Sequence, residues 1–270
     1  MLNARTLLCA AAVTLLCFFS HDPTSNSYET PPTLIELTIK AFGGGAREYT
    51  RENILQFYDS SFWFYTVLPV IVSMPAVSDF YEEWFNNGAY YLNVHRQQIL
   101  KYCVSKAFAY ALNAALIFLV GFSVFAAPVC MAFPGLDAEV LAIRFPNGFF
   151  AFAAMRVLNV VAVSAACPII TILILIFIKE KFLALSVPML TNYLTSQLGG
   201  FLLMRAYNEN KPYLRKINAL LPTAQFTQSL NFEGTFGAPL FVWYIAWTLM
   251  FALCGAGLFL LVKRRVKNGG

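Results

Sequence analysis

Long apolar runs alternate with polar segments along the chain. The runs fall at about 6–20, 61–78, 107–127, 158–178, 182–204 and 239–262. A helix needs roughly 20 apolar residues to cross about 30 Å of hydrocarbon, whereas the strands of a membrane barrel alternate over about 10 residues. The pattern therefore predicts an all-α, polytopic membrane protein, with six transmembrane helices in a single transmembrane domain, 1–270.

Composition supports the membrane prediction and excludes an ordinary soluble domain. Of the 270 residues, 59% are hydrophobic and only 12% are charged, whereas a soluble domain is about 25% charged. The formal net charge of +5 is modest, and basic loops at a membrane surface explain it. We therefore expect the lipid bilayer as a partner and no nucleic acid.

The first apolar run, 6–20, has two interpretations. It follows Arg5 and is short, as in a signal peptide. No small-x-small cleavage site follows it, because the chain continues as Ser20-His21-Asp22-Pro23. We favour a retained first span.

Basic residues give the orientation. They are dense at 96–106, at 179–181 and directly after the last span, at 263–267. Lys and Arg near span ends favour the cytoplasmic side. We therefore predict a multi-pass protein of the cell membrane with both termini in the cytoplasm. The segment 79–106 would then be cytoplasmic, and the outer loops would be 21–60, 128–157 and 205–238.

Short helices are predicted in the outer loops. The segments 33–42 and 47–58 have helix-like apolar spacing, and 148–157 is expected to form a separate interfacial helix before the fourth span. Arg156 falls at that junction, where a charge facing lipid is costly, so we expect it to reach the surface or to pair. In the second span, Pro69 and Pro75 are expected to kink or end the helix.

The segment 79–106 is too long and too polar for a simple turn. It is predicted to form two amphipathic helices that meet near Gly88, with aromatic residues at helical spacing in the first. One interpretation is a surface helix that anchors to lipid headgroups. The other is a docking element for a partner protein.

The residues of this segment resemble the first cytoplasmic loop of ABC-2 type permeases. The matching positions, just after an apolar span, are Glu82, Glu83, Gly88, Arg96, Tyr102 and Lys106. Span order and chain length are also similar to that family. The outer loop after the first span is larger than in many of its members.

The resemblance implies that this segment couples the chain to an ATPase. Glu82 or Glu83 would pair with Arg96 to hold the two helices, or would meet basic residues of the partner. The chain would be the permease subunit of an exporter, bound to two ABC ATPase subunits and to a second permease subunit, identical or related. ATP and Mg would bind the partner ATPase, with no cofactor on this chain. The substrate stays open, with an amphipathic molecule or a peptide compatible.

A polar face on the fifth predicted span is a candidate for the transport route or the dimer seam. Asn192, Thr195 and Ser196 lie on or beside this face, and packing between helices is the alternative explanation. The resemblance implies that the second and fifth spans form the walls of a central cavity, as in that family. By that resemblance the candidates on the second span are Phe62, Trp63, Tyr65 and Thr66.

The sequence lacks the usual patterns of catalysis and nucleotide binding. It has no G-x-x-x-x-G-K-[ST] motif, no H-E-x-x-H and no G-x-S-x-G. Its two histidines lack metal-ligand spacing, and its six cysteines contain no C-x-x-C and are expected to be buried free thiols. We therefore expect no enzyme activity. A secondary transporter or channel remains the rival, although Arg156 is the only charge in the predicted spans that could serve it.

Overall fold

The computed structural model describes residues 4–21, 31–46, 48–86, 99–144 and 148–219, together with scattered positions between 253 and 264. Within these ranges every named element is a helix. An isolated antiparallel bridge also pairs His21 with Thr33. The predicted helical class is therefore confirmed for this part of the chain.

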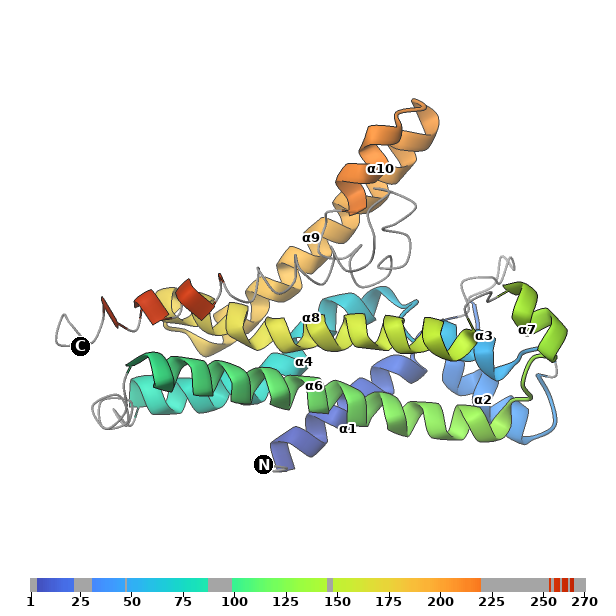
Figure 1. The fold of residues 1–270 in the computed structure, drawn as a ribbon, viewed down its shortest axis with the longest axis horizontal. Coiled ribbons are helices and arrows are strands. Elements are labelled where there is room, and N and C mark those ends of the chain that lie inside the picture. Colours follow the sequence, from blue (N-terminus) through green and yellow to red (C-terminus); the bar gives the residue numbers. More distant parts are fainter. Residues whose placement is uncertain are drawn as a thin grey trace.

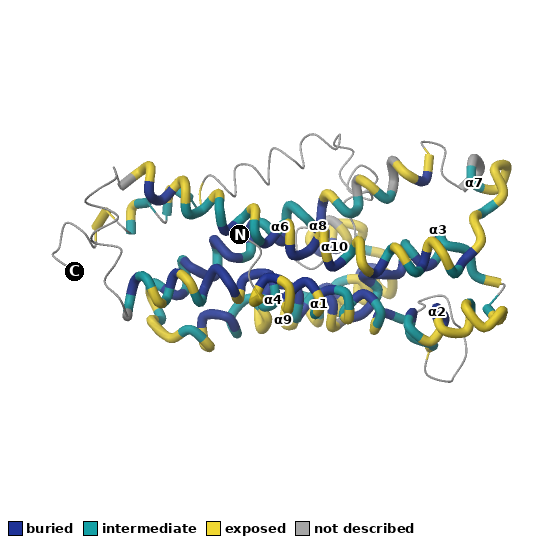
Figure 2. The backbone as a smooth tube through the Cα atoms, turned by 90° about the horizontal axis from the view of Figure 1, so that it is seen from below, coloured by how far each residue is buried: buried dark blue, intermediate teal, exposed yellow. Residues whose placement is uncertain are grey.

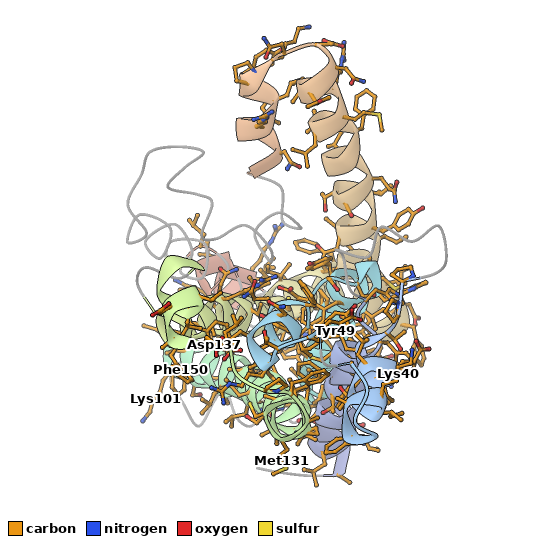
Figure 3. All side chains as sticks on the ribbon, turned by 90° about the vertical axis from the view of Figure 1, so that its right-hand side faces the viewer. Lys40, Tyr49, Lys101, Met131, Asp137 and Phe150 are labelled. Carbon is orange, nitrogen blue, oxygen red and sulfur yellow. The ribbon has the colours of Figure 1, made fainter. Side chains whose placement is uncertain are left out.

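The long helices form an elongated bundle (Figure 1). Its members are α1 (Ala4–Phe18), α4 (Phe62–Tyr81), α6 (Ile99–Ala132), α8 (Phe149–Ile178) and α9 (Lys181–Asn208). α6 packs against both α1 and α8, and α4 packs against α8 and α9. The far part of α9 leaves the bundle and forms a helical hairpin with α10 (Pro212–Ala219), which stands clear of the other helices (Figures 1 and 3).

Three helices of the described ranges are long and apolar enough to cross a membrane. They cover Trp63–Phe85, Leu100–Ala132 and Arg156–Ile178, and α1 is a shorter apolar helix. These helices indicate a membrane-embedded protein. The fifth predicted span, 182–204, forms α9, but the polar run from Thr191 to Gln197 lowers its hydropathy and it is not among the three. The sixth, 239–262, lies almost wholly outside the described residues.

Helix boundaries differ from the sequence prediction in three places. α4 passes through Pro69 and Pro75 without ending and continues into a short π-helix, η1 (Glu82–Asn86). α6 begins at Ile99, well before the predicted start at 107. α8 is one continuous helix, so the separate short helix predicted over 148–157 is wrong. The stretch is largely apolar and contains no proline or glycine after Gly148, so the helical backbone continues through it.

Three short helices cap one end of the bundle, which we call the outer end. Two of them, α2 (Leu34–Phe42) and α3 (Arg51–Gln56), were predicted, and α7 is Ala138–Arg144. Thr33 and Glu36 form a capping box at the start of α2. The buried Glu52 carboxylate accepts a hydrogen bond from the Leu136 N–H at 3.0 Å and pairs with Arg51. Burial alone would raise the pKa of Glu52, but these hydrogen bonds outweigh burial and lower it.

Helices α1 and α6 approach each other closely at Gly121. A β-carbon there would lie 2.6 Å from the Ala10 carbonyl oxygen and 2.7 Å from Val13 Cβ. The Thr14 hydroxyl donates to the Gly121 carbonyl at 2.9 Å. Val13 and Cys17 are fully buried, and Figure 2 shows the buried positions concentrated where α1, α4 and α6 face one another. α1 is therefore an integral part of the bundle core.

Replacing Gly121 by alanine should destabilise the bundle, because α1 must move away from the new methyl group. We expect a loss of about 1–3 kcal/mol in the free energy of unfolding, measured by thermal unfolding of the full chain in detergent. Gly200→Ala is the matched control, since nothing lies within 4 Å of a β-carbon there, and it should be neutral or stabilising by about 0.5–1 kcal/mol. Equal effects at both positions would contradict the close contact.

Candidate functional site

The ends of α4 and α6 meet through a polar cluster at the end of the bundle opposite to α2, α3 and α7. Glu83 lies in η1, directly after α4, and Tyr102 and Lys106 lie in the first two turns of α6. The Tyr102 hydroxyl donates to Glu83 Oε1 at 2.9 Å, and Lys106 Nζ forms an ion pair with Glu83 Oε2. We call these three residues the Glu83 clasp. All three were predicted from the sequence as coupling residues, and the structure brings them together.

Aromatic rings surround the clasp. Lys106 Nζ lies 5.9 Å from the ring centroid of Tyr102 and 5.7 Å from that of Tyr110. Next to it, Phe80 and Trp84 stack with their centroids 5.1 Å apart. The Glu83 side chain is only 12% exposed, against 31% for Lys106. Because water screens this pair poorly, each charge depends strongly on the other.

The other predicted coupling residues divide into two groups. Glu82 lies at the surface. Arg5 forms two ion pairs there, from Nη2 to Glu82 Oε1 at 3.7 Å and from Nη1 to Asp79 Oδ1 at 3.6 Å. These contacts place the start of α1 beside the end of α4, but both partners are about half exposed, so their energy is small. Gly88 and Arg96 lie outside the described residues, and the expected pairing of Arg96 with Glu82 or Glu83 stays a prediction.

A cavity of about 310 Å³ lies next to this end of α4. Its polar lining comes from Arg5, Glu82, Ser78 and Lys181. The apolar part of the lining is Leu8, Cys9, Met74 and Pro75. The cavity therefore adjoins α1, α4 and the first residue of α9, and Glu82 faces both it and the surface.

The predicted pathway residues form a contact between α4 and α9. Asn192 is buried, and its Nδ2 donates to the Tyr65 carbonyl at 2.9 Å. The Thr195 hydroxyl donates to the Thr191 carbonyl of its own helix at 2.8 Å. The remaining candidates differ in burial, since Thr66 is buried, Ser196 is half-buried and Trp63 is exposed. Phe62 is the first residue of α4, and its side chain is not among those that the structure describes. The Asn192 hydrogen bond packs α9 against α4, and a role of these residues in a transport route or a dimer seam stays a prediction.

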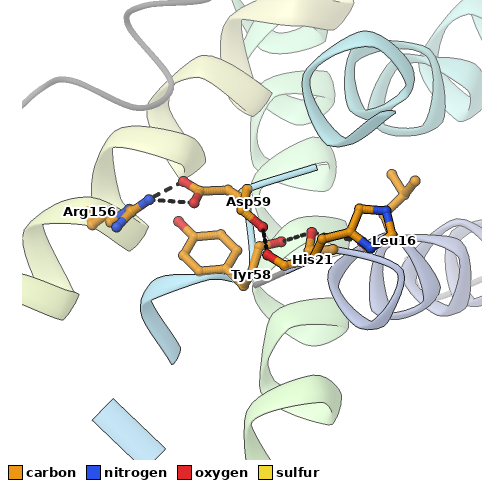
Figure 4. Close-up of polar contacts among 7 residues, drawn as sticks. Leu16, His21, Tyr58, Asp59 and Arg156 are labelled. Carbon is orange, nitrogen blue, oxygen red and sulfur yellow. Dashed lines mark hydrogen bonds and ion pairs between the residues drawn. The ribbon is translucent and has the colours of Figure 1, made fainter. Parts of the chain in front are cut away.

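A second ion pair lies near the outer end, where α4 begins. Arg156 Nε donates to Asp59 Oδ2 at 3.2 Å, and Nη2 pairs with Oδ1 (Figure 4). Asp59 is completely buried, which raises its pKa, while the positive charge of Arg156 opposes this shift. The guanidinium carbon also lies 5.7 Å from the ring centroid of Tyr58. The expectation that Arg156 pairs is therefore confirmed.

Backbone contacts hold the segment that carries Asp59. The Ser20 hydroxyl donates to the Tyr58 carbonyl at 2.7 Å, and the Ser60 hydroxyl donates to the His21 carbonyl (Figure 4). Asp59 was not predicted as the partner of Arg156, because it falls in the predicted outer loop 21–60, where water would solvate it. The available signal was its position two residues before Ser61, the N-cap of α4.

Metal ligands do not gather within the described ranges, where no group of three or more His, Cys, Asp or Glu side chains could hold an ion. The five cysteines described there are free thiols. No protein-family model, curated protein or solved structure matches this chain.

Removing Glu83 should destabilise the protein, because Lys106 and the Tyr102 hydroxyl would lose their partner in an aromatic environment. For Glu83→Ala we expect a loss of about 1–3 kcal/mol in thermal unfolding. The neighbouring Glu82→Ala, at a half-exposed position, should change stability by less than about 0.5 kcal/mol. If Glu83→Ala left the stability unchanged, the clasp would not stabilise the structure.

The Asp59–Arg156 pair should show strong coupling between its members. Arg156→Met alone leaves a buried carboxylate without its cation and should cost roughly 3–5 kcal/mol. The double variant Asp59→Leu with Arg156→Met removes both charges, so we expect it to unfold at a higher temperature than Arg156→Met. Additive losses in the double-mutant cycle would argue against a direct ion pair.

Proposed function

We propose that this chain is the permease subunit of an ATP-binding cassette exporter, in which the Glu83 clasp receives movement from a separate ATPase. The clasp is the observation that carries the proposal. It joins the ends of two apolar helices within a buried cluster that includes Trp84 and Tyr102, at the position where the sequence resembles the coupling loop of ABC-2 type permeases. The site acts mechanically, so the chain itself is not an enzyme.

The lengths of α4 and α6 support the transmission of movement from outside the membrane. The apolar part of α6 has 33 residues, which corresponds to about 50 Å of helix. The hydrocarbon of a bilayer is about 30 Å thick, so part of α6 extends beyond it. α4 and η1 together are also helical from Phe62 to Asn86. A helix pair that protrudes from the membrane can transmit a movement of an attached partner to the spans.

The surface of this end offers charges to a partner. We call the adjoining ends of α4, η1 and α6, which carry the Glu83 clasp, the elbow. Glu82 and Asp79 are half exposed on one side of it, and Lys101 is exposed at the start of α6. The neighbouring cavity, with Arg5, Glu82 and Lys181 in its wall, would widen or narrow as the elbow moves. We propose two ATPase subunits, which hold ATP and Mg, and a second permease subunit, identical or related. An amphipathic molecule or a peptide is the proposed cargo.

Topology follows from the same proposal. The Glu83 clasp, Arg5 and the turn between α8 and α9 lie at one end of the bundle, and this end would face the cytoplasm of the cell membrane. Both termini would be cytoplasmic. The cap of α2, α3 and α7 would face outwards.

The Asp59–Arg156 pair favours one rival function. Charged residues at the edge of a membrane span are common in the ion or proton sites of secondary transporters and channels. In that case the chain would need no ATPase. The rival is distinguished by transport of a substrate down an ion gradient by the purified chain alone.

Affinity purification of the full chain from its own cells tests the proposal. We expect an ATPase with a P-loop to co-purify. Glu82→Lys reverses a surface charge of the elbow and should reduce the ATPase recovered about tenfold, which is about 1.4 kcal/mol. Glu139→Lys, an exposed position on α7 at the other end of the bundle, is the matched control and should have no effect.

Two outcomes would refute the proposal. One is the absence of any ATPase from the wild-type preparation. The other is reaction of Lys101→Cys, but not Asp137→Cys, with a membrane-impermeant thiol reagent on intact cells. Both positions are exposed, with Lys101 in the first turn of α6 and Asp137 five residues after its last residue. That pattern would place the elbow outside.

A further inference from the structure

A second cavity, of about 270 Å³, lies near the outer end of the bundle between α3, α6 and α8. Most of its wall is apolar. The residues that line it are Leu55, Gln56, Tyr58, Phe122, Ala126, Phe149, Phe150, Ala153, Ala154, Arg156 and Val157. It is separate from the Glu83 clasp, and the inference drawn from it does not depend on the proposed transport function.

The wall of this cavity contains more hydrogen-bond donors than there are acceptors near them. Tyr58 is 1% exposed, and neither its hydroxyl nor the Gln56 amide nitrogen has a hydrogen-bond partner within the described residues. Arg156 uses Nε and Nη2 for Asp59, and a guanidinium has five N–H donors in all. A buried donor without an acceptor costs free energy. The cavity therefore needs a ligand that brings acceptor oxygens.

The charge exposed to the cavity is positive. Arg156 lines the cavity, but its partner Asp59 is completely buried and is not part of the lining. Figure 4 shows Tyr58 beside the pair, with its hydroxyl oxygen on the side of Arg156. An acidic group in the cavity would therefore meet the guanidinium and the Tyr58 hydroxyl before it met the carboxylate.

The cavity lies at the level where lipid headgroups are expected. The apolar span of α8 begins at Arg156, and that of α4 begins at Trp63, four residues after Asp59. The cavity is partly open, and at its rim Phe150 is 79% exposed on the flank of the bundle (Figure 3). Aromatic side chains at such a boundary commonly mark the interface between water and hydrocarbon.

We propose that this cavity binds one anionic lipid of the surrounding bilayer. The acidic headgroup oxygens accept hydrogen bonds from Arg156, Tyr58 and Gln56. The acyl chain begins against Phe122, Ala126 and Val157 and continues into the membrane, because the cavity is below the roughly 300–1,000 Å³ of a typical ligand pocket. The apolar wall disfavours a free phosphate, and the positive potential favours an acidic lipid over a neutral one.

Native mass spectrometry of the full chain in a neutral detergent tests this proposal. The probes are phosphatidylglycerol and phosphatidylcholine with the same acyl chains. We expect one phosphatidylglycerol per chain to be retained, with an affinity about tenfold above that for phosphatidylcholine, or about 1.4 kcal/mol. Equal retention of the two lipids would overturn the proposal.

Two variants locate the lipid. Tyr58→Phe removes a hydroxyl that has no partner among the described residues, so the unfolding temperature should be unchanged or higher. The preference for phosphatidylglycerol should fall only about threefold, because one hydrogen bond is lost while Arg156 remains. Ala126→Trp fills the cavity and should abolish retention, whereas Ala127→Trp, at the exposed and non-lining neighbour, should not. Wild-type lipid retention in Tyr58→Phe and Ala126→Trp, or equal loss in Ala126→Trp and Ala127→Trp, would overturn the site. If Ala126→Trp fails to fold, Tyr58→Phe decides alone.

Discussion

A charge without a partner is costly in an apolar bundle, and this constraint shapes both ends of α4. At its start, Asp59 is completely buried and is held by Arg156 of α8. Just beyond its end, Glu83 is held by Tyr102 and Lys106 of α6. Removal of one partner leaves the other uncompensated, which costs roughly 3–5 kcal/mol at the fully buried Asp59 and about 1–3 kcal/mol at the partly exposed Glu83 clasp. The two pairs therefore fix the position of α4 against α8 at one end and against α6 at the other.

The two polar ends differ in what they offer to other molecules. At the Glu83 clasp the acceptor and the donors satisfy one another, so the cluster is suited to hold two helices in a fixed arrangement. Near Arg156 the donors outnumber the acceptors, since the Tyr58 hydroxyl and the Gln56 amide nitrogen remain without partners in the described structure. The first arrangement is suited to hold helices together, whereas the second is suited to bind a ligand. This difference is why we assign mechanical coupling to one end and lipid binding to the other.

Sequence periodicity predicted the long helices well and their ends poorly. Apolar runs identified α4, α6 and α8 because burial of apolar area dominates their energy. The residues from Ile99 to Lys106 were predicted to be helical but separate from the third span, yet they form the first turns of α6, where Tyr102 and Lys106 contact Glu83. Likewise, the sequence predicted a partner for Arg156 but could not identify Asp59, since the two are 97 positions apart. Long-range pairing of this kind is decided by the packing of helices, which local spacing does not encode.

The prolines of α4 connect its two fixed ends. A proline removes one backbone hydrogen bond from the helix, so Pro69 and Pro75 weaken α4 between Asp59 and Glu83. Pro75 also lines the cavity beside the elbow. The outer part of α4 is anchored through Asp59 and through the Asn192 contact to Tyr65. A force on the elbow would therefore bend α4 near Pro75, before it moved the outer end, and would change the inner cavity first. In an exporter of the proposed kind, such bending would give access from the side of the elbow while the outer end stayed closed.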